Sequence, residues 1–357
     1  MNPDWLIFLT NHNAHIEQNR VLHFGQPAAE LAQAESGLLL IDLSHLGLIR
    51  FSGEDAQDFL QGQLSCDIRA ITPERAGYGG YCTPKGRLLC SFLIWQDASD
   101  HSYLMQLPAE LVESIAKRLR MFVLRSKVLI QDDSGHFIRI GIAGQNAQAW
   151  LQETLPDAPI TAAPMTVTSI PDGQIICHSA NRFEILTIPA QAPSLWEQLS
   201  KQVRCAGAPI WDWLEIGEGI PVIFKATQEQ FIPQMINLDS IDGVNFRKGC
   251  YPGQEIVART QYLGKVKRRM YRAHLDTDSH MEVSAGDSLF SADTGDQACG
   301  MIVNAAPSPA GGVDVLAVIQ TSSAETGPVH WKTPDGLQLA IQPLPYLAAC
   351  RTLQIKG

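Results

Sequence analysis

The feature that most constrains the fold is an internal repeat in which a strand pattern is followed by glycine and a helix pattern. Residues 53–61 align with 144–152 at an offset of 91, and both copies keep glycine, alanine, glutamine, leucine and glutamine at the same places. Later, Thr-Ile-Pro-Ala at 187–190 echoes Gln-Leu-Pro-Ala at 106–109, each time before a helical pattern. Two matches in the same order indicate that one supersecondary unit occurs twice.

Each copy combines short apolar strands with amphipathic helices. Pro-Lys-Gly at 84–86 predicts the turn of a hairpin, and Asp55 and Pro108 are expected to begin helices. We therefore expect an α+β fold made of two related units, approximately 1–130 and 131–245, which could be interleaved, each with helices on one face of an antiparallel sheet. The expected strands are 38–43, 46–51, 78–83, 87–95, 103–106 and 138–142, and the expected helices after the repeated glycines are 53–61 and 144–152.

The C-terminal part has a different pattern. After an acidic linker at 276–287, short strand-like runs at 301–303, 315–319 and 337–341 are separated by turns rich in glycine and proline. Such spacing is typical of a small β-barrel, which we expect over residues 275–357.

A basic window lies between these regions. Residues 247–272 contain eight Lys or Arg and one acid, a charge of +7, in a chain of net charge −10. The rest of the chain therefore sums to −17, and a concentrated positive field on an acidic protein predicts an anionic partner.

Cys250 lies inside this window, between two glycines and close to Arg247 and Lys248. Pro252 suits the first turn of a helix that continues through Arg259, which would put the thiol just before a helix N-terminus. Both features favour the thiolate, the form that attacks or binds metal. The alternative is that Cys250 is a small buried hydrophobe and the glycines only shape a turn.

Composition excludes several classes of protein. The eight cysteines form no C-x-x-C pair and the ten histidines have no metal-ligand spacing, so we expect no metal centre in this chain. With no export signal and no apolar run long enough to span a membrane, we expect a cytoplasmic location and no membrane contact. The acidic net charge argues against general nucleic-acid binding, although Lys265–Arg269 leaves a tRNA contact open.

Residues 248–255 resemble the K-G-C-[YF]-x-G-Q-E signature of the YgfZ family, folate-binding relatives of the glycine-cleavage T protein, an aminomethyltransferase. The resemblance touches most of the chain from residue 38 onward. It includes the segments 59–64, 85–87, 231–235, 237–239, 257–259 and 262–265.

The resemblance implies a fold and a function. The fold would be GcvT-like, with a folate-binding region at 1–270 that contains two related units and ends in a signature loop at 247–259, followed by the barrel at 275–357. The function would be that of an accessory protein for iron–sulfur cluster assembly or repair, linked to tRNA modification enzymes. A non-enzymatic role is favoured, and an enzymatic one would be folate-dependent one-carbon transfer. The cofactor would be tetrahydrofolate or another folate, and the partners iron–sulfur proteins or cluster-assembly factors.

The resemblance also implies roles for particular residues. Cys250 would be the functional thiol, which could bind a cluster, form a mixed disulfide or be redox active. Lys248 and the basic window would meet the glutamate tail of folate or an acidic partner surface. The expected folate-binding set is Lys248, Gln254, Glu255, Arg259, Asn237 and Asp239, of which Gln254, Glu255 and Arg259 could equally cap and brace the helix.

The sequence departs from the aminomethyltransferases at two places. Those enzymes carry an Asp-Asp pair after the hairpin turn, where this chain has Cys90-Ser91. The alternative function, a tetrahydrofolate-dependent one-carbon transferase, would therefore lack its acid/base or charge-stabilising carboxylate. The run 217–221 also differs from the relatives, which leaves both Glu215 and Glu218 as candidates for the acid that faces the pterin ring.

Overall fold

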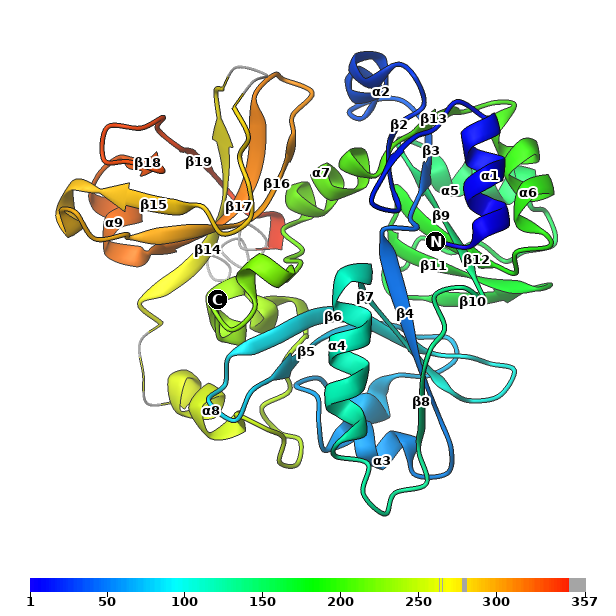
Figure 1. The fold of residues 1–357 in the computed structure, drawn as a ribbon, viewed down its shortest axis with the longest axis horizontal. Coiled ribbons are helices and arrows are strands. Elements are labelled where there is room, and N and C mark those ends of the chain that lie inside the picture. The colour runs from blue at the N-terminus through cyan, green and yellow to red at the C-terminus, as the bar shows by residue number, and fades with distance from the viewer. Residues whose placement is uncertain (263, 265, 278–280, 347–357) are drawn as a thin grey trace, which may run out of the picture. The chain divides into compact units, whose positions relative to one another are not determined.

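The computed structural model describes residues 1–357 except 263, 265, 278–280 and 347–357 (Figure 1). The chain forms two compact bodies, and each is built from several segments. Body 1 comprises Met1–Leu60, Ile68–Gly77 and Leu93–Trp211, and body 2 comprises Gln61–Asp67, Tyr78–Phe92 and Asp212–Gly357. None of the helices in the described part of the chain is both long and apolar enough to cross a membrane.

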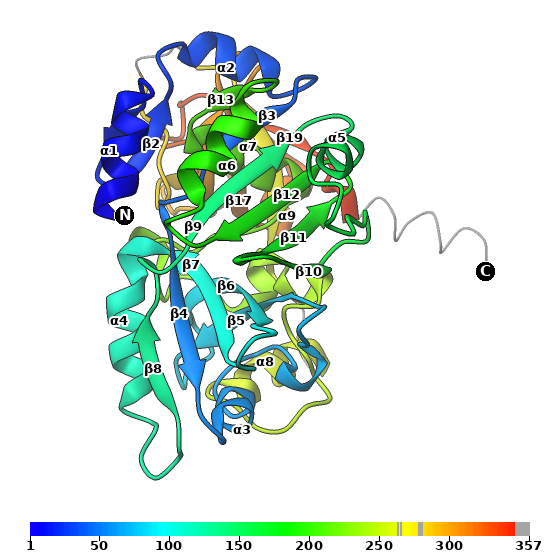
Figure 2. The same ribbon diagram turned by 90° about the vertical axis from the view of Figure 1, so that its right-hand side faces the viewer.

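The first sheet has the strand order β5-β6-β7-β4-β8. Strand β4 lies between β7 and β8 and is antiparallel to both. Strand β6 passes from body 2 into body 1, where its residues 93–96 pair with β7. The strands are β4 (Leu46–Ser52), β5 (Gly77–Cys82), β6 (Leu88–Gln96), β7 (Tyr103–Pro108) and β8 (Leu129–Asp132), and the helices are α3 (Ala56–Gln61) and α4 (Ala109–Arg120), which runs along β8 in Figure 2.

The second sheet belongs entirely to body 1 and has the order β10-β11-β12-β9-β3-β13. A core of buried apolar side chains, among them Trp5, Ile140 and Trp196, joins one face of this sheet to α1, α5 and α6. The strands are β3 (Leu39–Asp42), β9 (Ile138–Ala143), β10 (Val167–Ile170), β11 (Gly173–Ser179), β12 (Arg182–Thr187) and β13 (Arg204–Ala206), and the helices are α1 (Pro3–Asn11), α2 (Pro27–Gln33), α5 (Ala147–Thr154) and α6 (Ala192–Ser200). A separate ribbon pairs β1 (His15–Glu17) with β2 (Arg20–His23).

The two sheets confirm the predicted repeat. The order β5-β6-β7-β4-β8 corresponds strand for strand to β10-β11-β12-β9-β3, and the helix pair α3 and α4 corresponds to α5 and α6. The repeated glycines occupy the same structural place: Gly53 has φ +112° and Gly144 has φ +133°. A Cβ atom would lie 2.1 Å from the carbonyl oxygen of Lys127 at Gly53, and 1.9 Å from that of Gly37 at Gly144. Only glycine permits this backbone approach.

Most strands and helices lie where the sequence predicts them. The hairpin turns at Thr83–Gly86, where the Gly86 N–H donates to the Thr83 carbonyl at 2.9 Å, and α4 follows Pro108. Both helices after the repeated glycines begin three residues after the glycine, at Ala56 and Ala147. The Asp55 side chain accepts a hydrogen bond from the Lys127 backbone N–H at 2.7 Å, across the sheet edge.

Within body 1, polar side chains link the inner faces of the two sheets. The Trp95 indole N–H donates to Gln174 Oε1 at 2.7 Å, and the Gln106 amide donates to Glu184 Oε2 at 3.0 Å. Most buried polar groups in proteins are hydrogen-bonded, and these two pairs link the facing sides of the two sheets. The opposite face of the second sheet, which α1, α5 and α6 cover, is apolar.

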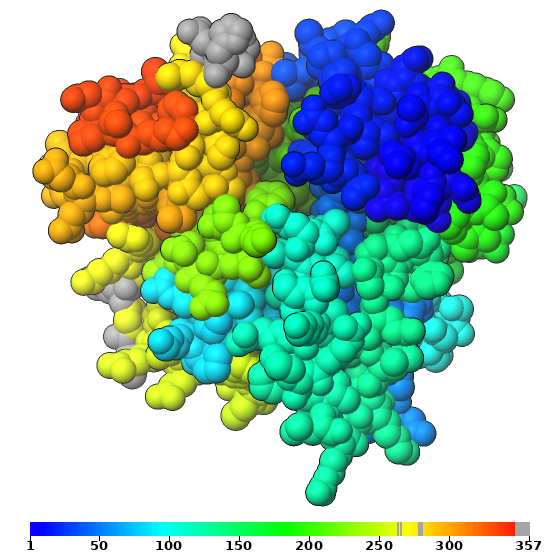
Figure 3. Space-filling view, viewed as in Figure 1, coloured from blue at the N-terminus to red at the C-terminus, as the bar shows by residue number. Residues whose placement is uncertain are grey.

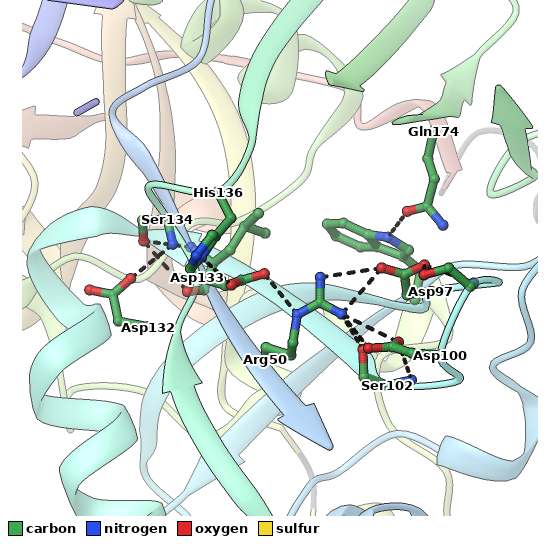
Figure 4. Close-up of polar contacts among 12 residues, drawn as sticks. Arg50, Asp97, Asp100, Ser102, Asp132, Asp133, Ser134, His136 and Gln174 are labelled. Carbon is green, nitrogen blue, oxygen red and sulfur yellow. Dashed lines mark hydrogen bonds and ion pairs between the residues drawn. The ribbon is translucent and has the colours of Figure 1, made fainter. Parts of the chain in front are cut away.

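Arg50 on β4 holds together the loops at one end of the first sheet (Figure 4). Its guanidinium lies between Asp133 on one side and Asp97 and Asp100 on the other, with N···O distances of 2.8, 3.2 and 3.1 Å. Ser102 accepts a further hydrogen bond. The buried carboxylates of Asp97 and Asp133 thus share the guanidinium of Arg50 as their partner, and we interpret the cluster as structural. Nowhere in the described residues are three or more His, Cys, Asp or Glu side chains placed to hold a metal ion.

Body 2 contains a six-stranded sheet that curls into a half-barrel, with the order β18-β15-β16-β17-β14-β19 (Figure 1). Its inner core includes Leu275, Leu289, Ile302 and Trp331. The strands are β14 (Arg268–Leu275), β15 (Ser288–Ser291), β16 (Gly300–Pro307), β17 (Val313–Gln320), β18 (Val329–Trp331) and β19 (Ala340–Gln342), and the helices are α7 (Ala208–Glu218, from Asp212 in this body), α8 (Gln254–Tyr262) and α9 (Thr321–Thr326). Short 3-10 turns at Lys225–Thr227, Pro233–Ile236 and Leu238–Ile241 lie between α7 and α8 along the chain.

The repeated glycines give a direct test of the fold. We expect Gly144→Ala to lower the free energy of unfolding by roughly 2–4 kcal/mol, because the new Cβ atom meets a backbone carbonyl and the positive φ is strained for alanine. Gly135→Ala is the matched control, since a Cβ atom there has nothing within 4 Å. Chemical denaturation measures both variants, and equal stability would show that Gly144 is not needed for this backbone approach.

Candidate functional site

Lys248 of the signature loop is bound to a distant segment of body 2. Its Nζ donates to the backbone carbonyl oxygens of Leu64 and Cys66, at 2.7 and 2.6 Å, and lies 5.5 Å from the centre of the Tyr251 ring. Two of the three N–H donors of the ammonium are therefore used by carbonyls. The side chain fixes the loop against residues 64–66 across more than 180 residues of sequence.

Side chains at both ends of the loop fold back onto its backbone. Asn245 Oδ1 accepts hydrogen bonds from the backbone N–H groups of Arg247 and Lys248, at 2.7 and 3.1 Å. Gln254 Nε2 donates to the carbonyl oxygens of Lys248 and Gly249, at 3.4 and 3.2 Å. Cys250 lies in this hydrogen-bonded loop and its side chain is exposed.

The helix after the loop begins later than the sequence predicted. It starts at Gln254, whereas we expected Pro252 in its first turn. The reason is Gly253, whose φ of +82° lies outside the helical region. A Cβ atom at Gly253 would lie 2.5 Å from the Thr83 carbonyl oxygen and 2.6 Å from the Gly86 Cα, so the hairpin turn packs directly on the start of α8. Cys250 therefore precedes the first helical residue by four positions.

Buried thiols lie on the inner side of the loop. Burial raises the pKa of Cys66 and of Cys82 to about 12 each, and for Cys66 the charge of Lys248 offsets only part of that rise. Burial also raises the pKa of Cys90 and of Tyr251. These groups are protonated at neutral pH. Among the cysteines that the structure describes, only Cys250 is exposed; Cys205 is half-buried and the others are buried.

The remaining residues of the expected folate-binding set fall into two groups. Glu255 and Arg259 lie exposed on α8. Asn237 and Asp239 are turned into body 2, where Asp239 forms a two-pronged ion pair with Arg269 at 2.8 and 3.1 Å. Asn237 donates to a backbone carbonyl of β14 at 2.9 Å. The structure thus brings Lys248, Cys250 and Gln254 together, while Asn237 and Asp239 brace β14.

Part of the basic window is also used for internal contacts. Besides Arg269, Arg272 faces Asp314 at 3.9 Å. Lys267 is exposed, and Lys265 lies outside the described residues. A tRNA contact through Lys265–Arg269 remains a prediction, with one of its cations already paired to Asp239.

Cys90 and Ser91, which occupy the place of the Asp-Asp pair of the aminomethyltransferases, are both buried. Cys90 is fully buried in β6, and Ser91 Oγ donates to the Pro221 carbonyl at 2.9 Å while accepting from the Ile223 N–H at 3.0 Å. Ser91 therefore ties β6 to the segment after α7. No acid stands at either position to assist one-carbon transfer.

The two acids considered for the pterin ring lie on α7, and both are half-buried. Glu215 lines a recess with Asp212 and Asn304 whose volume, about 10 Å³, is that of a single water molecule. This recess at Glu215 is too small to hold a pterin ring.

A third acid, Glu184 in body 1, was missed by the sequence analysis. Its side chain is 0 % exposed, Oε2 is hydrogen-bonded to Gln106 and to His178 Nε2 at 3.1 Å, and Oε1 has no hydrogen-bond partner. The amide oxygen of Gln106 is also buried without a partner. The signal was present in the sequence: an acid in the apolar run 183–186 of a fully buried strand is unusual, because buried carboxylates need partners.

Cations and a tryptophan complete the surroundings of Glu184. Arg139 on the neighbouring strand is buried, and burial lowers the pKa of its guanidinium although Glu184 partly offsets that shift. Trp211 packs against Gly141, where an added Cβ atom would lie 2.7 Å from the indole ring. The guanidinium of Arg182 lies 4.8 Å from the centre of the same ring. The interior around Glu184 therefore contains buried acidic and basic side chains together.

Comparisons with known proteins agree on one family. The model of the GCVT N-terminal domain matches residues 15–241. The tRNA-modifying protein YgfZ of Sodalis glossinidius is 32% identical over 324 residues, covering 90% of this chain and 96% of that protein. The protein of the same name from Colwellia psychrerythraea is 33% identical over 232 residues, which cover 65% of this chain and 70% of that protein.

The fold is that of the glycine-cleavage T proteins. The aminomethyltransferase T of the glycine cleavage system from Bartonella henselae superposes with a TM-score of 0.78 over 97% of this chain and 98% of that one. The two sequences are 16% identical, so this likeness shows the shared architecture of two related α+β units and a C-terminal curled sheet.

The burial of the thiols predicts their reactivity. In the native protein at pH 8, iodoacetamide should label Cys250 and leave Cys66, Cys82 and Cys90 unlabelled. These three thiols are buried, so the reagent does not reach them, and burial also raises their pKa so that they are almost entirely protonated. Mass spectrometry of tryptic peptides gives the extent of labelling at each site, and labelling after denaturation in guanidinium chloride is the control. Equal labelling of Cys66 and Cys250 in the native state would contradict the described loop.

Proposed function

The chain belongs to the YgfZ family, within the wider GCVT N-terminal domain family, and on this premise we propose that it is a folate-binding accessory protein for iron–sulfur cluster assembly or repair. Its clients would be iron–sulfur enzymes that modify tRNA. The observation that carries the proposal is the exposed Cys250 on a braced loop, in a protein whose other described thiols are buried or half-buried.

The geometry of the loop supports a role for Cys250 in contact with another protein. Asn245, Lys248 and Gln254 all stabilise the backbone around the thiol, so its position is fixed before a partner arrives. A preorganised, exposed thiol suits transient contact with a client protein. Cluster binding, a mixed disulfide and redox activity are three distinct outcomes that experiments on Cys250 separate.

The chemistry of Glu184 supports folate as the ligand. The pterin ring presents a 2-amino group and a ring N–H side by side, and a carboxylate accepts both in a two-pronged contact. Glu184 Oε1 and Gln106 Oε1, both buried without a hydrogen-bond partner, offer acceptors of this kind. Because they are fully buried, neighbouring side chains such as Trp211 have to move when a ligand enters. Folate bound there would bring its pterin ring to the carboxylate, and this chain's residues would hold and orient it.

The signature loop offers positive charge to an anionic partner. Arg247 is exposed on the signature loop, whereas the ammonium of Lys248 is half-buried and bonded to carbonyls. We therefore assign the contact with an acidic partner surface to Arg247 and the support of the loop to Lys248. The one-carbon transferase alternative is less well supported, because Cys90 and Ser91 supply no carboxylate and Ser91 is engaged with Pro221 and Ile223.

Cys250→Ser tests the thiol. In cells that depend on this protein, we expect the variant to reduce the methylthiolated nucleosides of tRNA to the level seen without the protein, because serine is neither a metal ligand of comparable strength nor a disulfide former. Cys205→Ser, at the half-buried thiol, is the matched control and should keep the wild-type level. Nucleoside mass spectrometry provides the measurement, and wild-type levels in the Cys250→Ser strain would refute the role of the thiol.

Glu184→Gln tests the folate contact. We expect tetrahydrofolate to bind about tenfold or more weakly, because the amide loses the charge and one acceptor that the pterin donors require. Isothermal titration with the purified variant measures the affinity, and thermal unfolding checks that the nearly isosteric change leaves the fold intact. Glu153→Gln on the exposed side of α5 is the control. Unchanged affinity in Glu184→Gln would remove this residue from the site.

A further inference from the structure

The loop between α4 and β8 carries an unusual concentration of exposed apolar side chains. Met121, Phe122, Leu124 and Leu129 are 61, 43, 88 and 55% exposed, and they are four of the nine large apolar residues that are exposed in the described part of the chain. We call these four residues the apolar tip. Its segment projects beyond the end of α4 in Figure 3, and Figure 2 shows the same projection from the side. Several exposed large apolar side chains on one projecting segment, which ends in the first residue of β8, are typical of an interaction surface.

Positive charge surrounds the apolar tip. Residues 117–127 contain five Lys or Arg and no acid, in a chain of net charge −10. Lys117 and Arg125 are exposed, and Lys127 is paired with Glu54 at 2.7 Å. Arg120 is anchored through two hydrogen bonds to the Ile130 carbonyl, at 3.0 and 2.9 Å. A complementary surface would therefore be acidic around an apolar centre.

The segment has a fixed shape. Consecutive turns close it, with backbone hydrogen bonds from Phe122 to Leu119 at 3.0 Å and from Ser126 to Val123 at 2.8 Å. Leu124 has φ +47°, a left-handed conformation that is strained for leucine and presents its side chain to solvent.

The base of the segment is held equally firmly. The Lys127 N–H donates to Asp55 Oδ2 at 2.7 Å, and Gly53 admits the Lys127 carbonyl so closely that no Cβ atom would fit. The surface is thus preorganised, which lowers the entropic cost of binding.

We propose that the apolar tip docks into an apolar pocket rimmed by carboxylates on a protein partner. This inference rests on the proposed function, because the partner it names is the client iron–sulfur enzyme. RNA fits less well, since aliphatic Met121 and Leu124 dominate the apex and do not stack on bases as aromatic rings do. An anionic membrane fits less well, because a fluid lipid surface does not require the fixed backbone shape that the closed turns and Leu124 give this segment, whereas a protein pocket does.

The test uses the full-length protein and, as probe, the purified apo form of an iron–sulfur tRNA methylthiotransferase. The double variant Met121→Gln with Leu124→Asn removes the apex, and asparagine tolerates the left-handed backbone better than leucine does. We expect it to bind the enzyme about tenfold or more weakly by surface plasmon resonance. Ile7→Gln, which removes an equally exposed apolar side chain from α1, should bind like wild type. Arg125→Glu should weaken binding most at low salt.

Each outcome decides the inference. Binding that is absent, or equal in wild type and the double variant, overturns the docking proposal. Bulk tRNA and phosphatidylglycerol vesicles are tested in parallel, and binding of either one that is lost in the double variant, without such a loss for the enzyme, assigns the surface to nucleic acid or membrane instead. The proposed function fails separately: it is refuted when Cys250→Ser has no effect on tRNA methylthiolation, whatever the double variant does.

Discussion

The fold depends on a backbone contact that only glycine allows, and the contact occurs twice. At Gly53 and Gly144 the chain leaves a strand with positive φ and lets the carbonyl of another segment approach where a side chain would stand. This approach occurs at the strand–helix junction and brings in the segment that leads to the neighbouring strand, β8 in the first sheet and β3 in the second. The paired sheets then place Gln106 and Glu184 opposite each other. The polar interior of body 1 is therefore a consequence of backbone geometry at two residues.

In body 2, glycines likewise allow a close backbone contact at the signature loop. Gly253 and Gly86 allow the hairpin turn and the start of α8 to touch, and the ammonium of Lys248 links the loop to the carbonyls of residues 64 and 66. What looked from the sequence like a charged group beside a thiol is mainly a structural link. The exposed thiol owes its fixed position to hydrogen bonds with backbone atoms.

The sequence predicts the local architecture well, because local periodicity and turn chemistry carry that information. The hairpin at 83–86, the helix after Pro108 and the two glycine-led repeats all follow from residues within a few positions of each other. The start of α8 was placed two residues too early, because the positive φ of Gly253 depends on contact with Thr83. The partners of Lys248 lie more than 180 residues away, and Glu184 meets Gln106 across 78 residues. Such pairings follow from tertiary structure, so they are not encoded in any local pattern.

The pairing of strand β3 has a consequence for how the chain folds during synthesis. Residues 39–42 leave the ribosome early, yet their partners in the sheet are β9 at 138–143 and β13 at 204–206. In the first copy of the repeat, the last strand of the sheet is β8, which directly follows its own helix α4. In the second copy, the corresponding strand is β3, which is synthesised about 100 residues before its neighbour β9. A long-range pairing of this kind is slow and leaves an apolar strand without its sheet for much of translation. Strand β3 can therefore take its place in the sheet only after β9 has been synthesised.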